Sequence, residues 1–331
     1  MRTGAPAGHQ GYFHEAVFYN TDEEFLAIAI PFLEQGVAAG EPAVVGVGGG
    51  TAELLRAALT GIPGVVFLDD REGRRTRPAN TIATNRQFLA DRLTDGAQQI
   101  RVLGEVPHPG LGAPWDWWAR YEATINHAFA AFPAWGLCPY DTRLISDDVA
   151  ADVVRTHPHL ATVDGRHVPN PRYQEPADFL AQRPAGDVDP LEATTRPVVD
   201  LLDPTPAAAR NAARAVGDAT VLDEIEVDDT VLAVSEAVTN ALAHGRRPVR
   251  LRLWSAPERV VASISDAGPG PSDPFAGLLP TTGTTSAGLG LWMIHRVCTH
   301  VTMGTTDRGF TIRLVMRSGT TEEDGHVRQP A

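Results

Sequence analysis

The chain has 331 residues, 43% of them hydrophobic, and a formal net charge of −13 at pH 7. This length favours two domains, and the acidic balance argues against nucleic acid as a partner and suits a basic protein surface. The two cysteines lie far apart, which excludes a disulfide framework and a zinc motif built on paired cysteines. No apolar run reaches the roughly 18 residues of a membrane span, and no signal peptide pattern begins the chain. We therefore expect a cytoplasmic protein that does not bind membranes; a homodimer is left open.

The first half of the chain alternates between short apolar runs and helical patterns. The apolar runs predict buried strands at 43–47, 65–68, 100–105 and 135–140. The helical patterns between them cover 23–39, 52–59, 79–93, 116–131 and 147–156. Pro31 is expected to kink the first helix. This alternation predicts an α/β domain with a mostly parallel sheet covered by helices on both faces.

A glycine-rich segment at 46–51 follows the first of these strands and opens a helix. It lacks the Gly-Lys-Ser/Thr ending of a phosphate-binding loop, and the chain contains no lysine. The spacing of a dinucleotide-binding loop also fails, because Thr51 stands where the last glycine belongs. A tight turn is the favoured interpretation, and weak anion binding at the start of the helix is the alternative.

Several short segments resemble the MEDS sensory domain of bacterial regulators. They are His14–Tyr19, Phe32–Gly36, Gly40–Pro42, Cys138–Asp141 and Arg155–Pro158. The resemblance spans about residues 11–165. It implies a ligand sensor related to RecA-type ATPase folds, without a working Walker loop, and in several proteins this domain is joined to a GHKL domain. We place the sensory domain at residues 11–180.

Ligands of an open parallel sheet bind outside the carboxyl ends of its strands. Polar side chains gather at those ends in the first half of the chain. They predict a sensory pocket formed by Glu105, His108, Cys138, Tyr140 and Asp141. The alternative is that Cys138 is a small buried hydrophobic residue and His108 an ordinary loop residue beside two prolines.

Residues 181–197 are rich in Pro, Gly, Asp and Thr and show no apolar period. We interpret this segment as the linker between two domains. The second domain is then expected at 198–317, followed by a polar, disordered tail at 318–331.

The stretch from Val231 to His244 has the period of an amphipathic helix. Each residue advances about 100° around the axis, so Glu236, Asn240 and His244 share one face and apolar residues the other. A carboxylate and an amide one turn apart suit a metal–nucleotide site. A solvated polar stripe would give the same pattern, and His244 before Gly245 is also a common helix end.

Two further motifs follow this helix. A predicted strand ends at Asp266, and Gly268 and Gly270 behind it allow the backbone to approach a ligand closely. An uncharged segment rich in Thr, Gly and Ser then leads into Gly288-Leu289-Gly290 at the start of a helix. Free N–H groups and the helix dipole favour phosphate at such a place. Each motif alone is also a common turn or cap.

Together and in this order, the three motifs resemble those of the GHKL ATPase superfamily. The sequence Ser-Glu-Ala-Val-Thr-Asn-Ala at 235–241 is most similar to the corresponding motif of the bacterial anti-sigma-factor serine/threonine kinases. The resemblance covers about residues 195–317 and implies an α+β two-layer sandwich, of the Bergerat type, that binds ATP and Mg²⁺. In these kinases the first helix supplies an arginine that meets partner proteins, a position that Arg210 and Arg214 match loosely.

The resemblance also implies roles for single residues. Glu236 is implied as the general base or water-orienting carboxylate, Asn240 as the Mg²⁺ ligand and Asp266 as the acceptor of the adenine amino group. The remaining residues are implied to shape the adenine pocket (Gly268, Gly270) and to form the hinge of the lid over the phosphates (Gly288, Leu289, Gly290).

The expected function is that of a cytoplasmic signalling regulator. The resemblance implies an ATP-binding anti-sigma factor or serine/threonine kinase, which switches between a sigma factor and a STAS-type anti-sigma antagonist under control of the sensory domain. No arginine lies between Arg259 and Arg296, so the lid lacks a cation for the γ-phosphate. Nucleotide binding is therefore the firmer expectation than kinase turnover.

Three alternatives remain. The protein is a nucleotide-dependent binding protein without turnover, a sensor histidine kinase, or a regulator whose second domain is a structural remnant. A histidine kinase would need a phospho-acceptor such as His14 within a helical hairpin, whereas His14 precedes a strand-like run.

Overall fold

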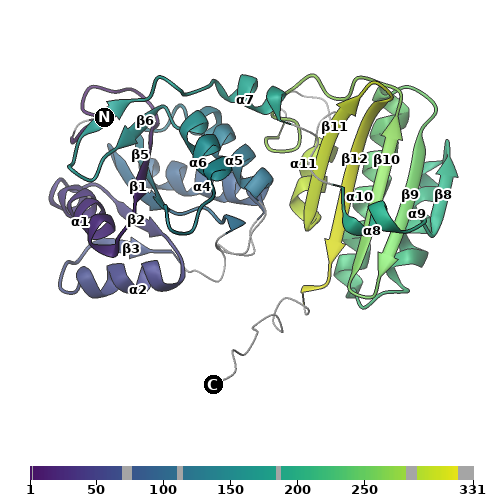
Figure 1. The fold of residues 1–331 in the computed structure, drawn as a ribbon, viewed down its shortest axis with the longest axis horizontal. Helices are drawn as coiled ribbons and strands as arrows, with labels where there is room; N and C mark the ends of the chain where they lie inside the picture. The colour runs from purple at the N-terminus through teal and green to yellow at the C-terminus, as the bar shows by residue number, and fades with distance from the viewer. Residues whose placement is uncertain (2, 69–76, 110–114, 184–187, 281–288, 320–331) are drawn as a thin grey trace. The chain divides into compact units, whose positions relative to one another are not determined.

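The computed structural model describes residues 1, 3–68, 77–109, 115–183, 188–280 and 289–319. The chain divides into two compact units, residues 1–182 and 183–331, which Figure 1 shows with their elements labelled. The division falls within the segment predicted as a linker. None of the described helices is long and apolar enough to cross a membrane.

A seven-stranded sheet forms the centre of the first unit, with the strand order β3-β2-β4-β5-β1-β6-β7. Its strands are β1 (Phe13–Tyr19), β2 (Ala43–Gly46), β3 (Val65–Phe67), β4 (Ile100–Gly104), β5 (Ala134–Asp141), β6 (His159–Ala161) and β7 (His167–Pro169). All neighbours pair in parallel except β6 and β7. The predicted α/β fold with a mostly parallel sheet is confirmed.

The helices of this unit are α1 (Asp22–Ala38), α2 (Gly49–Ala58), α4 (Pro78–Thr94), α5 (Trp115–Ala128), α6 (Asp147–Thr156) and α7 (Pro176–Gln182). Helix α1 packs against β1, β2, β4 and α2, whereas α4, α5, α6 and α7 pack against one another. Helix α1 continues through Pro31. Helix α2 begins three residues earlier than predicted, because Gly48 serves as its N-cap.

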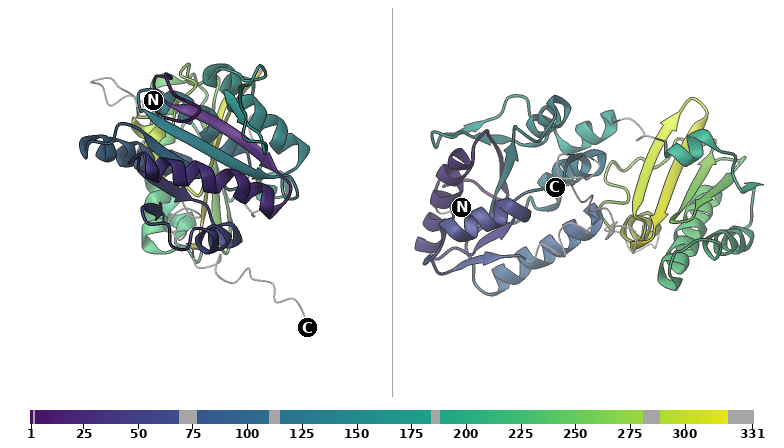
Figure 2. Two further views of the ribbon diagram at one scale, coloured as in Figure 1. Left: turned by 90° about the vertical axis from the view of Figure 1, so that its left-hand side faces the viewer. Right: turned by 60° about the horizontal axis from the view of Figure 1, so that its bottom comes forward.

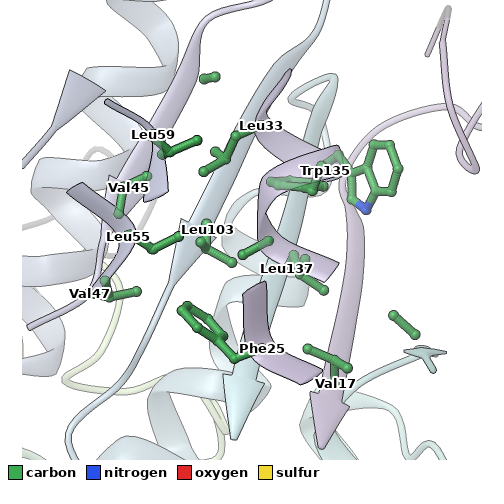
Figure 3. Close-up of a cluster of buried hydrophobic side chains, with 14 of the residues drawn as sticks. Val17, Phe25, Leu33, Val45, Val47, Leu55, Leu59, Leu103, Trp135 and Leu137 are labelled. Atoms are coloured by element: carbon green, nitrogen blue, oxygen red, sulfur yellow. The ribbon is translucent and has the colours of Figure 1, made fainter. Parts of the chain in front are cut away.

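The main hydrophobic core lies between α1 and the sheet (Figure 3). Phe25 and Leu33 of α1 meet Val17 of β1 and Trp135 and Leu137 of β5, all of them buried. Successive side chains of a strand point to opposite faces. The intervening residues of β1 and β5, among them His14, Cys138 and Tyr140, therefore point to the other face of the sheet.

An antiparallel sheet of five strands forms the second unit, in the order β11-β12-β10-β9-β8. The strands are β8 (Val199–Leu202), β9 (Arg250–Ala256), β10 (Arg259–Asp266), β11 (His300–Thr306) and β12 (Gly309–Arg317). Helices α9 (Pro206–Gly217) and α10 (Glu224–His244) pack on one face of the sheet, as the right-hand view of Figure 2 shows. Helix α11 (Leu289–Val297) packs against α10 and β11. This is the predicted α+β two-layer sandwich.

Helix α10 extends seven residues further towards the N-terminus than Val231. A capping box starts it: the Asp223 side chain accepts from the backbone N–H of Glu226, whose side chain accepts from the backbone N–H of Asp223. This reciprocal pair satisfies two of the N–H groups that a helix start leaves open. The long, capped helix holds its C-terminal half, with Glu236 and Asn240, in a fixed register.

The second half of the segment interpreted as a linker, residues 181–197, contains a regular element. Residues Pro190–Thr194 form a short helix, α8, capped by Asp189. Leu191 packs on a buried cluster that includes Trp254, and Glu192 accepts a hydrogen bond of 2.9 Å from Arg313 of β12. This part of the segment therefore belongs to the second unit, where it covers the sheet face opposite α10. The predicted tail beyond Gly319 lies outside the described residues.

A buried ion pair ties α1 to β4 in the first unit. Arg101 Nε lies 2.6 Å from Glu41 Oε2, and Arg101 Nη1 donates to the Phe32 carbonyl at 2.8 Å. Both side chains are almost fully shielded from solvent. A buried carboxylate of this kind is tolerated only while its partner is present.

We expect Arg101→Met to destabilise the first unit by about 3–5 kcal/mol, because it leaves the Glu41 carboxylate buried without a cation, held only by hydrogen bonds from Gln99 and Thr3. Urea unfolding followed by tryptophan fluorescence measures the change. Arg250→Met is the matched control, since Arg250 and Asp200 form an exposed pair on the second unit and exposed pairs contribute little. Equal effects of the two substitutions would contradict the importance of the buried pair.

Candidate functional site

A cavity of about 370 Å³ opens in the second unit. Its walls come from α10, β10, β12, the loop after β10 and the first turn of α11. Apolar side chains form most of the lining, namely Ala237, Ala241, Ile264, Leu291, Phe310 and Ile312. The polar side chains that line it are Asn240, His244, Asp266, Ser272 and Asp273. A mostly apolar hollow with a few converging polar groups is typical of a small-molecule site.

Asp266 is the buried acceptor of this cavity. It ends β10, and its Oδ1 accepts hydrogen bonds from the backbone N–H of Gly268 at 2.6 Å and of Arg246 at 3.1 Å. No hydrogen bond among the described residues engages Oδ2. The carboxylate is thus held through one oxygen, while the other remains able to accept from an N–H group of a ligand.

Close packing explains the glycines around Asp266. A Cβ atom on Gly245 would lie 2.4 Å from Asp266 Cγ, and one on Gly268 would lie 2.7 Å from Asp266 Oδ1. Gly270 has a positive φ of 77°, and a Cβ there would lie 2.4 Å from the Phe310 ring. Gly245 belongs to this site as much as Gly268 does. In the sequence, its position directly after a helix indicated only a helix end.

Gly290, in the glycine-rich motif at the start of α11, lies close to Glu236 and Asn240 of α10. A Cβ atom on Gly290 would lie 2.8 Å from Glu236 Oε2 and 3.3 Å from Asn240 Nδ2, so the start of α11 lies directly against both side chains. Asn240 lines the cavity, whereas Glu236, one turn earlier on α10, lies beside it and is not among the lining residues. Gly288 and the segment before it lie outside the described residues.

His244 keeps both of its interpretations. It is the last residue of α10 and lines the cavity. Of the two arginines on α9, Arg210 donates to Ser235 Oγ at 3.2 Å, next to Glu236 in the sequence. Arg214 forms an exposed ion pair with Asp228. No arginine is present among the described residues that line the cavity.

The structure does not bring the five residues of the predicted sensory pocket together. Cys138 and Tyr140 point to the face of β5 that α5 covers, where Tyr140 donates to Glu122 Oε1 at 3.1 Å. Asp141 points to the opposite face and accepts hydrogen bonds from the Arg143 side chain through both carboxylate oxygens. The pocket was predicted because these residues lie near the carboxyl ends of strands. Side chains alternate between the two faces along β5, so Cys138 and Tyr140 are separated from Asp141.

Glu105, His108 and Asp141 remain near one another on their side of the sheet. His108 is buried, and this burial lowers its pKa although the charge of Asp141 opposes the shift. Burial by itself would raise the pKa of Asp141, but the hydrogen bonds and charge of Arg143 outweigh it and lower that pKa. These residues form a partly buried polar group in which the Asp141 carboxylate is already paired with Arg143.

The glycine-rich segment at 46–51 has a carboxylate at its helix start. The backbone N–H of Gly48 points to Glu105 Oε2 at 3.5 Å, and Gly48 provides no side-chain cap for α2. A carboxylate in that position competes with any anion. The geometry therefore favours the tight-turn interpretation.

Two family models match the chain. The MEDS model, described as the methanogen/methylotroph, DcmR sensory domain, matches residues 13–158. The model of the histidine kinase-like ATPase domain matches residues 202–316, which include all three motifs around the cavity. Among the curated proteins, none matches the chain significantly.

Among solved structures, the histidine kinase domain of the E. coli osmosensor EnvZ, determined by NMR, resembles part of the chain. The two are 19% identical over 41% of this chain and 99% of that domain, with a TM-score of 0.23. The assignment of the two domains rests on the family models.

We expect Gly268→Ala to destabilise the second unit by about 1–3 kcal/mol, because the added Cβ displaces Asp266 from the N–H groups that hold it. Gly319→Ala is the matched control, since a Cβ there has its nearest neighbour at an ordinary 3.6 Å. Urea unfolding in the absence of nucleotide measures both. A Gly268→Ala variant as stable as the control would show that Asp266 is not held in this way.

Proposed function

We propose that this chain, which joins a MEDS sensory domain to a histidine kinase-like ATPase domain, binds ATP with Mg²⁺ and acts as a partner-switching anti-sigma factor and protein serine/threonine kinase. One observation carries the proposal. Three segments that are far apart in the sequence, around Asn240, Asp266 and Gly290, converge on one cavity of about 370 Å³.

Asp266 marks the adenine end of the proposed site. Its free Oδ2 is an acceptor for an exocyclic amino group, and the apolar side chains of Ile264 and Ile312 line the cavity near it. A mostly apolar cavity with a buried carboxylate acceptor suits a purine that carries an amino group. Because the carboxylate is already fixed by two backbone N–H groups, ordering it costs little free energy on binding.

Asn240 and Glu236 mark the phosphate end. The amide oxygen of Asn240 and the carboxylate of Glu236 are hard oxygen donors of the kind that Mg²⁺ prefers. The start of α11 lies against both side chains, and the dipole at a helix start favours phosphate. Asn240 would hold the ion. When bound, Mg²⁺ would neutralise phosphate charge, and Glu236 would orient and deprotonate the attacking hydroxyl.

The partners that we propose are a sigma factor and a STAS-type anti-sigma antagonist. The net charge of −13 suits a basic protein surface. A phosphate placed on a serine or threonine of the antagonist adds charge at the interface and changes which partner is held. The MEDS domain supplies the input to this switch.

A second candidate function is nucleotide-dependent partner binding without turnover. It is favoured by the absence of arginine among the described lining residues and of lysine in the whole sequence, since phosphoryl transfer is usually assisted by such a cation. The histidine kinase alternative has less support. His14 is fully buried in β1, and its ring is bonded to Asn126, which leaves it poorly placed to accept a phosphoryl group.

We expect Asp266→Asn to weaken ATP binding by about 10- to 100-fold, because the amide loses the charged hydrogen bond to the adenine amino group. The amide oxygen still accepts from Gly268 and Arg246, so the fold is kept. Calorimetry with ATP and Mg²⁺ on the full chain measures the affinity. Asp200→Asn, at an exposed edge of the sheet, is the control and should bind as the wild type does.

Glu236→Gln should leave ATP binding within a few-fold of wild type and slow phosphate transfer to a STAS partner by about 10²- to 10⁴-fold, the usual contribution of a general base. Labelled ATP and mass spectrometry of the partner measure transfer. Acid-stable label on serine or threonine supports the kinase. A wild-type protein that holds the partner with ATP but transfers no label supports binding without turnover, and acid-labile label on the chain itself supports a histidine kinase.

A further inference from the structure

Four side chains that can bind metal ions meet inside the first unit, away from the nucleotide cavity. They come from four elements: His14 from β1, Glu122 from α5, Cys138 from β5 and His157 from the end of α6. His14, Glu122 and His157 are fully buried and Cys138 is 7% exposed. Their candidate ligand atoms all lie within 4.8 Å of one another.

The hydrogen bonds around the cluster fix which nitrogen of each histidine faces inward. His14 Nδ1 lies 3.0 Å from Asn126 Oδ1. The amide nitrogen of Asn126 donates to the backbone carbonyls of Glu122 and Thr156 at 3.0 and 2.8 Å, so its oxygen must be the atom that faces His14. The proton of the His14 ring therefore resides on Nδ1, and its Nε2 presents a lone pair to the cluster.

His157 is held in the same manner. Its Nδ1 lies 2.8 Å from the carbonyl oxygen of Val153, which can only accept. Its Nε2 therefore also carries no proton, and this nitrogen has no hydrogen-bond partner in the part of the chain that the structure describes. This arrangement, in which one ring nitrogen donates to an outer acceptor and the other faces inward, is typical of histidines that bind metal ions.

Three of the four inward-facing atoms, His14 Nε2, His157 Nε2 and Glu122 Oε2, present lone pairs, and Cys138 Sγ lies 3.3 Å from His14 Nε2. His14 Nε2 lies 3.2 Å and His157 Nε2 3.3 Å from Glu122 Oε2, and that oxygen too lacks a hydrogen-bond partner among the described residues. Lone pairs this close repel one another in a low-dielectric interior, and buried acceptors without partners are costly. A cation at the centre of the cluster relieves this repulsion.

We propose that His14, Glu122, Cys138 and His157 form a four-coordinate site for a divalent transition metal ion, with Zn²⁺ as the ion that the donor set suits best. Two imidazoles, a thiolate and a carboxylate match the nitrogen, sulfur and oxygen ligands of zinc. The thiolate and the carboxylate together balance the charge of the ion, which makes the buried site neutral overall. This proposal does not depend on the nucleotide site.

The distances agree with a tetrahedral site. Zinc bonds of about 2.0–2.3 Å correspond to ligand–ligand separations of about 3.3–3.8 Å. His14 Nε2 lies 3.3 Å from Cys138 Sγ and 3.2 Å from Glu122 Oε2, close to that range. The widest pair, at up to 4.8 Å, needs to approach by about 1 Å. The other oxygen of Glu122 accepts from Tyr140, which orients the carboxylate as an outer hydrogen bond does in zinc proteins.

The test uses the full chain, stripped with a chelator and then titrated with Zn²⁺ or Co²⁺. Elemental analysis after dialysis should find one zinc per chain. The Co²⁺ form should show a thiolate-to-cobalt charge-transfer band and the ligand-field bands of tetrahedral cobalt. In competition with a chromophoric chelator, Cys138→Ser and His157→Gln should each weaken Zn²⁺ binding by at least about 100-fold.

Two matched controls should keep the ion and the cobalt spectrum. They are Cys298→Ser, which removes the other buried thiol, and His108→Gln, which removes a buried histidine outside the cluster. Wild-type protein without stoichiometric zinc, or without the thiolate band in its Co²⁺ form, would overturn the proposal even if the variants failed to fold. Undiminished Zn²⁺ binding by folded Cys138→Ser and His157→Gln would overturn it as well.

Discussion

A buried polar group must find a partner, and this requirement explains the main features of both units. Arg101 and Glu41 satisfy it with each other. Asp266 satisfies it through Oδ1, which accepts hydrogen bonds from two backbone N–H groups. Its Oδ2 remains able to accept a hydrogen bond from a ligand. The cluster around Glu122 does not satisfy it with protein groups alone. Pairing is thus incomplete at both places where we propose that the protein binds a ligand or an ion.

The regular elements could be predicted because their signals are local. Apolar runs marked β2, β3, β4 and β5, and the helical period marked α1, α5 and α6, each to within a few residues, whereas α10 was found without its first seven residues. The three motifs could be found because their residues and their order along the chain resemble those of a known family. Of their glycines, Gly270 has a local reason, a positive φ of 77°, whereas neighbouring side chains exclude a Cβ at Gly268 and Gly290.

Other features depend on contacts that the sequence does not reveal. Helix α8 has only five residues, and its place is set by Leu191 on Trp254 and by Glu192 with Arg313. Gly245 appeared to be a helix end, although the Asp266 carboxylate is what excludes a side chain there. The sensory pocket was predicted from strand ends, and the alternation along β5 then placed Cys138 and Asp141 on opposite faces.

The metal cluster has no sequence signature for a related reason. Its ligands lie at positions 14, 122, 138 and 157, with no two of them in the short spacing by which zinc motifs are recognised. The parallel sheet creates the site, because pairing of β1 with β5 sets His14 beside Cys138 on the face that α5 covers. An ion held there would link two central strands to two helices of the sensory unit. Loss of the ion, or oxidation of the Cys138 thiolate, would leave the remaining acceptors facing one another and would weaken that link. A change in the occupancy of this site would thereby alter the packing of α5 and α6 on the sheet, which is the kind of internal change that a sensory domain needs.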